Sequence, residues 1–226
     1  TACDLHLTTK KLSYRLTTDL DIVIVIEALS QDFIRHFWTF IKSGGYKLYC
    51  SNGKPRFYRF LKPTNSQYPT KIEILSRYEE QLDAPAEMRV SRLTLDEESV
   101  SLSAIMLDDD YYNLILGHLE TVFEIPTVDF VCLMLLKMKA FVNLTSDRKS
   151  GITIGSGDIS KHKNDVFRLA QLLTGQEVIF VTKNIKKDID MFIDFILSEG
   201  ISLKSISVVG SVDGYMTQFK DIFVLE

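Results

Sequence analysis

The first part of the chain alternates short apolar runs with polar and glycine-containing breaks. Residues 21–27 read DIVIVIE, a β-branched apolar run that follows a carboxylate pair, and this pattern predicts a buried strand with its charged end at a sheet edge. Residues 30–41 carry apolar side chains at helical spacing and lead into Ser43-Gly44-Gly45. They predict an amphipathic helix that packs on the sheet and ends at the glycines.

Further strands are predicted after this helix. Residues 46–50 and 56–61 predict a hairpin, because the Asn52-Gly53 pair between them favours a tight turn. Residues 71–75 read KIEIL, and their alternation predicts a half-buried strand in which Glu73 points away from its apolar neighbours.

The remaining pattern predicts one more hairpin, over residues 88–107, and then a helix-rich part of the chain. The predicted helices span residues 127–142 with Thr127 as the cap, residues 161–173 and residues 185–197, with a loop over 148–160 and a polar tail at the end. These elements predict an α+β fold, in which a mixed β-sheet flanked by helices is followed by a helical C-terminal half. We expect two domains, one over residues 1–125 and one over residues 126–226.

Composition and charge indicate a globular protein and argue against several other classes. The chain is 46% hydrophobic and 25% charged, which is typical of a globular protein. The net charge of −4 argues against a general nucleic-acid surface, so any RNA contact would need a local basic patch. The apolar runs are far shorter than the roughly 20 residues that cross a bilayer, so no membrane span is expected. The three cysteines lack metal-binding or disulfide spacing, and a reducing cytoplasm is the expected location.

A pair of carboxylates, Asp19 and Asp21, stands where the first strand begins. Strand side chains alternate between faces, so both point to the same face. Carboxylate oxygens suit Mg²⁺ or Mn²⁺, and such a pair leaves metal positions for phosphate. Glu73 is the best candidate for a third ligand, with Glu79 or Glu80 as alternatives, because a carboxylate is unusual in the middle of a strand. Taken alone, the Asp pair is also typical of a solvated strand entry.

Lysines in the apolar helix over residues 127–142 form a second candidate feature. An unpaired ammonium there is costly, so Lys137 needs a partner, which is either a phosphate or a carboxylate such as Asp165. Lys139 projects about 200° around the helix from Lys137 and cannot serve the same site equally. Lys161 and Asp165 are spaced i and i+4, which by itself predicts a helix-surface pair.

The order of these motifs resembles a known family. The residues that carry the resemblance form an Arg-x-Thr-x-Asp-x-Asp motif and are Arg15, Thr17, Asp19 and Asp21. With the strand, helix, hairpin and acidic strand that follow, they are similar to the acidic motif of the AbiEii/AbiGii toxin family, a branch of the DNA polymerase β-like nucleotidyltransferase superfamily. Residues 136–140 and 161–166 resemble that family's central helix and its Lys-and-Asp helix, so the resemblance covers about residues 1–175.

The resemblance implies a nucleotidyltransferase-like catalytic core over residues 1–125. The implied activity is metal-dependent transfer of a nucleotide from a nucleoside triphosphate to a hydroxyl of RNA, such as a transfer RNA end, or of a protein. The implied metal ligands are Asp19, Asp21 and Glu73, and the implied nucleotide-binding residues are Arg15, Thr17, Lys137 and Asp165. The implied catalytic residues are the three metal ligands together with Lys137 and Asp165. If the chain is the toxin of a toxin–antitoxin or phage-defence pair, an antitoxin protein is a further implied partner.

One feature of that family has no counterpart in this sequence, namely the Gly-Gly or Gly-Ser turn before the acidic strand. Residues 1–7 resemble the residues that directly follow that turn, so we expect the glycines to lie upstream of Thr1. The missing turn supports a second hypothesis, in which the chain keeps the fold and acts as a non-catalytic binding or regulatory module.

Overall fold

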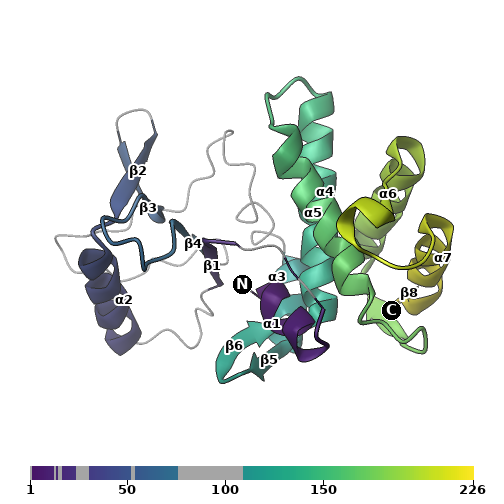
Figure 1. Cartoon of the computed structure of the whole chain (residues 1–226), viewed down its shortest axis with the longest axis horizontal. Helices are drawn as coiled ribbons and strands as arrows, with labels where there is room; N and C mark the ends of the chain where they lie inside the picture. Colours follow the sequence, from purple (N-terminus) through teal and green to yellow (C-terminus); the bar gives the residue numbers. More distant parts are fainter. Residues whose placement is uncertain (1, 13, 15–16, 24–30, 52–53, 76–108) are drawn as a thin grey trace. The chain divides into compact units, whose positions relative to one another are not determined.

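The computed structural model describes residues 2–12, 14, 17–23, 31–51, 54–75 and 109–226 (Figure 1). The chain divides into two compact units. The first unit comprises Leu16–Tyr112 with Thr1, and the second comprises Ala2–Arg15 together with Asn113–Glu226. The α+β class and the helical C-terminal half predicted from the sequence are both confirmed.

A four-stranded mixed sheet forms the first unit. Its strands are β1 (Asp19–Val23), β2 (Lys47–Ser51), β3 (Lys54–Leu61) and β4 (Lys71–Leu75). They lie in the order β1-β4-β3-β2, with β1 parallel to β4 and the other neighbours antiparallel. Strands β2 and β3 pair down to Ser51 and Lys54, which confirms the predicted hairpin, although its two connecting residues lie outside the described residues.

Helix α2 (Gln31–Gly44) packs on one face of this sheet and confirms the predicted amphipathic helix. Its Phe37 and Trp38 rings meet the ring of Phe60 on β3 edge-on, with ring centroids 5.5 and 5.7 Å apart. Ile72 and Ile74 of β4 belong to the same apolar cluster. Because strand side chains alternate, the odd-numbered residues 71 and 73 of β4 lie on the opposite face.

Two strands of this unit differ from prediction in burial. Among the described strands, β1 lies at the sheet edge, and its apolar residues Ile22 and Val23 are half-buried, whereas the apolar run predicts a buried strand. Strand β4 is buried on both faces over residues 72–75, whereas alternation predicts a half-buried strand. Residues 24–27, the predicted hairpin over 88–107 and the alternative acids Glu79 and Glu80 lie outside the described residues.

The second unit is built around one long helix, α4 (Phe130–Lys149), most of whose side chains are buried. Helices α5 (Ser156–Ala170) and α6 (Lys183–Glu199) pack against α4, and α1 (Ala2–Thr9) contacts both α4 and α5. Figure 1 shows α4, α5 and α6 side by side. The shorter elements are α3 (Asp109–Gly117), β5 (Leu119–Val122), β6 (Ile125–Val128), β7 (Ile179–Val181), the 3-10 helix η4 (Leu203–Ile206), α7 (Val212–Ile222) and β8 (Phe223–Leu225).

Element boundaries in this unit correct three predictions. Helix α4 is capped by Asp129, whose carboxylate accepts from the Cys132 amide, whereas Thr127 lies in the β5–β6 hairpin. The predicted loop over 148–160 is shorter, because α4 continues to Lys149 and α5 begins at Ser156. The predicted polar tail is wrong, because it contains α7 and β8, and β8 pairs in parallel with β7.

The predicted domain boundary after residue 125 falls within the second unit, inside the hairpin that pairs Leu119 with Val128. Nearby, the His6 ring on α1 lies 2.7 Å from the Val128 carbonyl oxygen and 3.3 Å from the Glu120 carboxylate. These contacts tie α1 to the hairpin and explain why the first helix belongs to the second unit. Within the described part of the chain, no helix is long and apolar enough to cross a membrane.

Candidate functional site

The face of the sheet opposite α2 carries the acidic residues that the sequence singles out. In the parallel pairing of β1 with β4, Asp19 lies beside Lys71 and Asp21 lies beside Glu73. In the antiparallel pairing of β3 with β4, Arg59 lies beside Glu73. Paired positions in adjacent strands share a face, so the sheet brings three carboxylates and two cations to one surface.

Glu73 is the most enclosed member of this cluster, with 3% of its side chain exposed. Its Oε1 accepts from Nε of Arg59 at 2.6 Å, and its Oε2 accepts from Nζ of Lys71 at 2.6 Å. A buried carboxylate needs such partners, because an uncompensated charge in a poorly solvated position is costly. Both carboxylate oxygens of Glu73 are therefore engaged by cations of the same face.

Lys71 connects the buried Glu73 carboxylate to Asp19. Its Nζ lies 3.4 Å from Oδ2 of Asp19, while Oδ1 of Asp19 accepts from the Thr70 hydroxyl at 3.2 Å. Burial lowers the pKa of the Lys71 ammonium, but the carboxylates of Glu73, Asp21 and Asp19 outweigh this effect and raise it above its usual value. Lys71 therefore stays charged throughout the neutral pH range.

The two aspartates are more accessible than Glu73. The Asp19 side chain is 44% exposed, and Asp21 is also exposed at the edge strand. The pair fits two ligands of a hard divalent cation, because both are carboxylates on one face with solvent access for further ligands. Glu73 does not fit as the third ligand in this arrangement, since Arg59 and Lys71 occupy its oxygens. Among the described residues, no group of three His, Cys, Asp or Glu side chains is placed to hold a metal.

The two motif residues that precede the Asp pair are placed differently. Arg15 lies outside the described residues. Thr17 belongs to the first unit, and its Oγ1 is buried and has no hydrogen-bond partner among the residues that the structure describes.

Lys137 and Asp165, the predicted nucleotide-binding residues of the helical half, both lie in the second unit. Lys137 is half-buried on α4 and makes no hydrogen bond or ion pair with any residue that the structure describes. Asp165 is fully buried on α5, where it accepts from the Tyr14 hydroxyl at 2.9 Å and from Nη1 of Arg168 at 3.1 Å. The Lys137–Asp165 ion pair, one of the two alternatives for Lys137, does not form.

Two further lysines pair with residues that the sequence pattern does not predict. The predicted Lys161–Asp165 surface pair is wrong, because Asp165 faces the core and Lys161 pairs with Asp158 one turn earlier, at 3.1 Å. Lys139 pairs with Asp188 of α6 at 2.7 Å, and this ion pair joins α4 to α6.

The sequence pattern does not predict Arg59 and Lys71 as members of the acidic cluster. The spacing of Lys71 and Glu73 carries a usable signal, because residues i and i+2 of a strand share a face. Arg59 carries no such local signal, because its approach to Glu73 depends on the register between β3 and β4.

Comparison of the chain with protein-family models, with curated proteins and with solved structures finds no match.

Proposed function

We propose that the face of the sheet around Asp19 and Asp21 binds a divalent cation together with a nucleoside triphosphate, and that the protein is a nucleotidyltransferase. The observation that carries this proposal is the placement of two accessible carboxylates beside a lysine on one face of adjacent parallel strands. Carboxylates suit Mg²⁺ or Mn²⁺, and an ammonium beside them suits phosphate oxygens. The motif resemblance of Arg15, Thr17, Asp19 and Asp21 points to the same chemistry.

In this proposal, Asp19 and Asp21 hold the metal. The bound cation supplies charge neutralisation and orientation of the triphosphate. Lys71 binds a phosphate oxygen, and Glu73 positions Lys71 through their 2.6 Å contact. Arg59 contacts Glu73 at 2.6 Å from the neighbouring strand and holds its carboxylate in place. Glu73 is thus a positioning residue in the proposed site, instead of the third metal ligand that the sequence predicts.

The proposed reaction is attack of an acceptor hydroxyl on the α-phosphorus. A new bond forms between the acceptor oxygen and this phosphorus, the bond from the α-phosphorus to the α,β-bridging oxygen breaks, and pyrophosphate leaves while the hydroxyl proton passes to solvent. The acceptor class is an RNA end, such as that of transfer RNA, or a protein side chain. We also propose that the protein acts in the cytoplasm as a toxin with an antitoxin partner. Only the motif resemblance supports this part of the proposal.

A transfer assay tests the proposal. The protein is incubated with Mg²⁺, each of the four α-³²P-labelled nucleoside triphosphates, and either total transfer RNA or a protein extract. We expect label in one acceptor class, and its loss in Asp19→Asn and Asp21→Asn. Asp32→Asn, which alters an exposed carboxylate on α2, serves as the control and should transfer label normally. Equal transfer by all variants would place the chemistry elsewhere.

A second candidate function is a non-catalytic module of the same fold, and the ion pairs of Glu73 favour it. Three carboxylates that share a face repel one another unless cations compensate them, and here Arg59 and Lys71 supply that compensation without metal. Such a cluster can be purely structural. The distinguishing result is metal-dependent triphosphate binding, which the enzyme requires and a structural cluster does not.

A further inference from the structure

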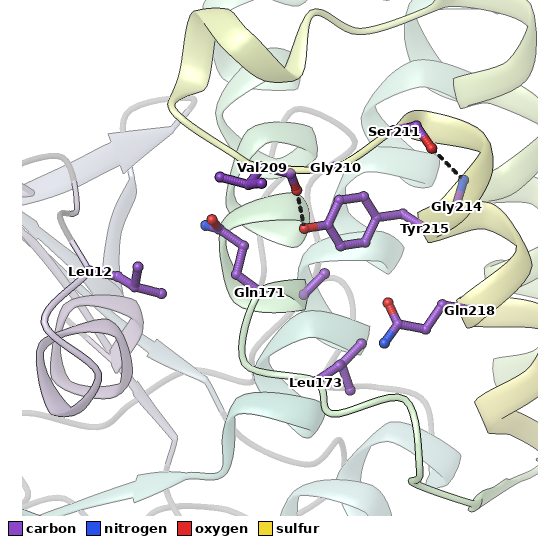
Figure 2. A pocket seen from close by; sticks show the side chains of 10 residues that line it. Leu12, Gln171, Leu173, Val209, Gly210, Ser211, Gly214, Tyr215 and Gln218 are labelled. Carbon is purple, nitrogen blue, oxygen red and sulfur yellow. Dashed lines mark hydrogen bonds between the residues drawn. The ribbon is translucent and has the colours of Figure 1, made fainter.

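A pocket of about 570 Å³ lies in the second unit, where the end of α5 approaches the segment before α7 and the first turns of α7 (Figure 2). Its volume is within the range of roughly 300–1,000 Å³ that is typical of small-molecule sites. The side chains that give it chemical character are Gln171, Leu173, Val209, Ser211, Tyr215 and Gln218. None of the described residues that line it is charged.

Tyr215 provides a rigid aromatic wall of this pocket. Its hydroxyl donates to the Val209 carbonyl oxygen at 2.8 Å, and its ring packs edge-on against Phe167 with centroids 5.6 Å apart. Gly210 has a φ of 114°, and a Cβ at this position would lie 3.2 Å from Cε2 of Tyr215. The Tyr215 ring is therefore held in place by its contacts with Val209 and Phe167 and by the close approach of Gly210.

Two carboxamides reach the same pocket, as Figure 2 shows. Gln218 is half-buried, and its carboxamide makes no hydrogen bond with the part of the chain that the structure describes. Gln171 donates one long bond, 3.3 Å, to the Arg168 carbonyl oxygen. Each carboxamide offers both donors and an acceptor, so the pair can satisfy a ligand that carries both kinds of group.

The charge around the pocket argues against an ionic ligand. Its described lining offers no cation for a phosphate and no carboxylate for an amine. Asp213 lies in the exposed first turn of α7, beside the pocket residues Ser211 and Gly214, and would repel an anion there. The Ser211 hydroxyl accepts a hydrogen bond from the Gly214 amide at 3.1 Å, so this amide at the start of α7 is not available to an anion.

We propose that this pocket binds a neutral planar heterocycle with hydrogen-bond donors and acceptors along its edge, as in a nucleobase. The ring stacks on Tyr215, Gln218 and Gln171 bind its edge groups, and Leu173 and Val209 cover its apolar surface. The site lies wholly within the second unit and does not depend on the proposed activity of the sheet face.

The test titrates the full chain with adenosine, guanosine, cytidine and uridine, which are uncharged, and measures binding by saturation-transfer NMR and calorimetry. At least one nucleoside should bind the wild type. Gln218→Leu should weaken its binding about tenfold, because the leucine cannot pair with the ring edge. Tyr215→Ala should abolish detectable binding by removing the stacking surface. Gln176→Leu changes an exposed glutamine outside the pocket and should leave binding unchanged.

The proposal is overturned if no nucleoside binds, or if binding survives unchanged in Gln218→Leu. Gln218 is partly exposed, so this variant keeps the test decisive even if Tyr215→Ala fails to fold, which circular dichroism would reveal. The 5′-monophosphate of the bound nucleoside should bind no more tightly than the nucleoside itself. Tighter binding of the monophosphate would identify an anion site and contradict the proposal.

Discussion

At the scale of single residues, Glu73 shows how far one side chain can be predicted. A carboxylate in the middle of an apolar strand indicates an unusual position, and the structure places it at 3% exposure on the face that carries Asp19 and Asp21. Its partners were not predictable in the same way. Arg59 comes from a neighbouring strand, and only the register of β3 against β4 brings it to Glu73.

The buried position of Glu73 leads to a stability prediction. Glu73→Gln removes the charge that compensates Arg59 and Lys71, and should lower the free energy of unfolding of the first unit by about 2–3 kcal/mol. Urea unfolding followed by the fluorescence of Trp38 measures this, because Trp38 is the chain's single tryptophan and packs in that unit's core. Asp19→Asn is the control and should cost less than about 1 kcal/mol, since the Asp19 side chain is 44% exposed and its ion pair is screened by solvent. An equal loss of unfolding free energy in the two variants would contradict a stabilising role of the ion pairs of Glu73 with Arg59 and Lys71.

Lys71 leads to a second prediction, which rests on the proposed function. Its ammonium lies 3.4 Å from an Asp19 oxygen that the proposed metal would use, so the two cations compete. Lys71→Met should bind Mn²⁺ alone about tenfold more tightly than the wild type. Electron paramagnetic resonance of free Mn²⁺ measures this without any reaction. Lys42→Met, an exposed lysine on α2, is the control. Unchanged Mn²⁺ affinity in Lys71→Met would exclude the competition.

At the scale of elements, the apolar periodicity predicts the helix over Gln31–Gly44, the β2–β3 hairpin and the helix over Lys183–Glu199 well. It fails at Val212–Ile222, because Gly214 and polar residues interrupt the sequence there. The helix forms because Met216, Phe219 and Ile222 reach a shared buried face. Tertiary packing of this kind is not visible in the local sequence.

The start of α4 gives a prediction at this scale. Asp129→Ala removes the carboxylate that accepts from the Cys132 amide and also contacts His118 at 2.7 Å. It should destabilise the second unit by about 1–2 kcal/mol. Thr127→Val changes the residue that the sequence predicts as the cap, and should cost less than about 0.5 kcal/mol because Thr127 lies in β6. Thermal and urea unfolding monitored by circular dichroism at 222 nm compares them. A larger loss of stability in Thr127→Val than in Asp129→Ala would support Thr127 as the helix cap instead.

At the scale of the whole molecule, the predicted site residues divide between the compact units. Asp19, Asp21 and Glu73 belong to the first unit, and Lys137 and Asp165 belong to the second. Sequence order alone could not assign Asp165 its role, because its hydrogen bond from Tyr14 joins positions 151 residues apart. That contact ties the segment after α1 into the second unit. The proposed chemistry therefore rests on the sheet face of the first unit.

The central claim is that Asp19 and Asp21 form a metal-dependent triphosphate site, and a calorimetric titration tests it most directly. A non-hydrolysable nucleoside triphosphate analogue is titrated, with and without Mn²⁺, into the wild type, Asp21→Asn and the control Asp32→Asn. The account predicts binding to the wild type and the control only when Mn²⁺ is present, and at least tenfold weaker binding to Asp21→Asn, because the variant loses a charged metal ligand. Binding that is independent of Mn²⁺, or equal in the wild type and Asp21→Asn, would contradict it.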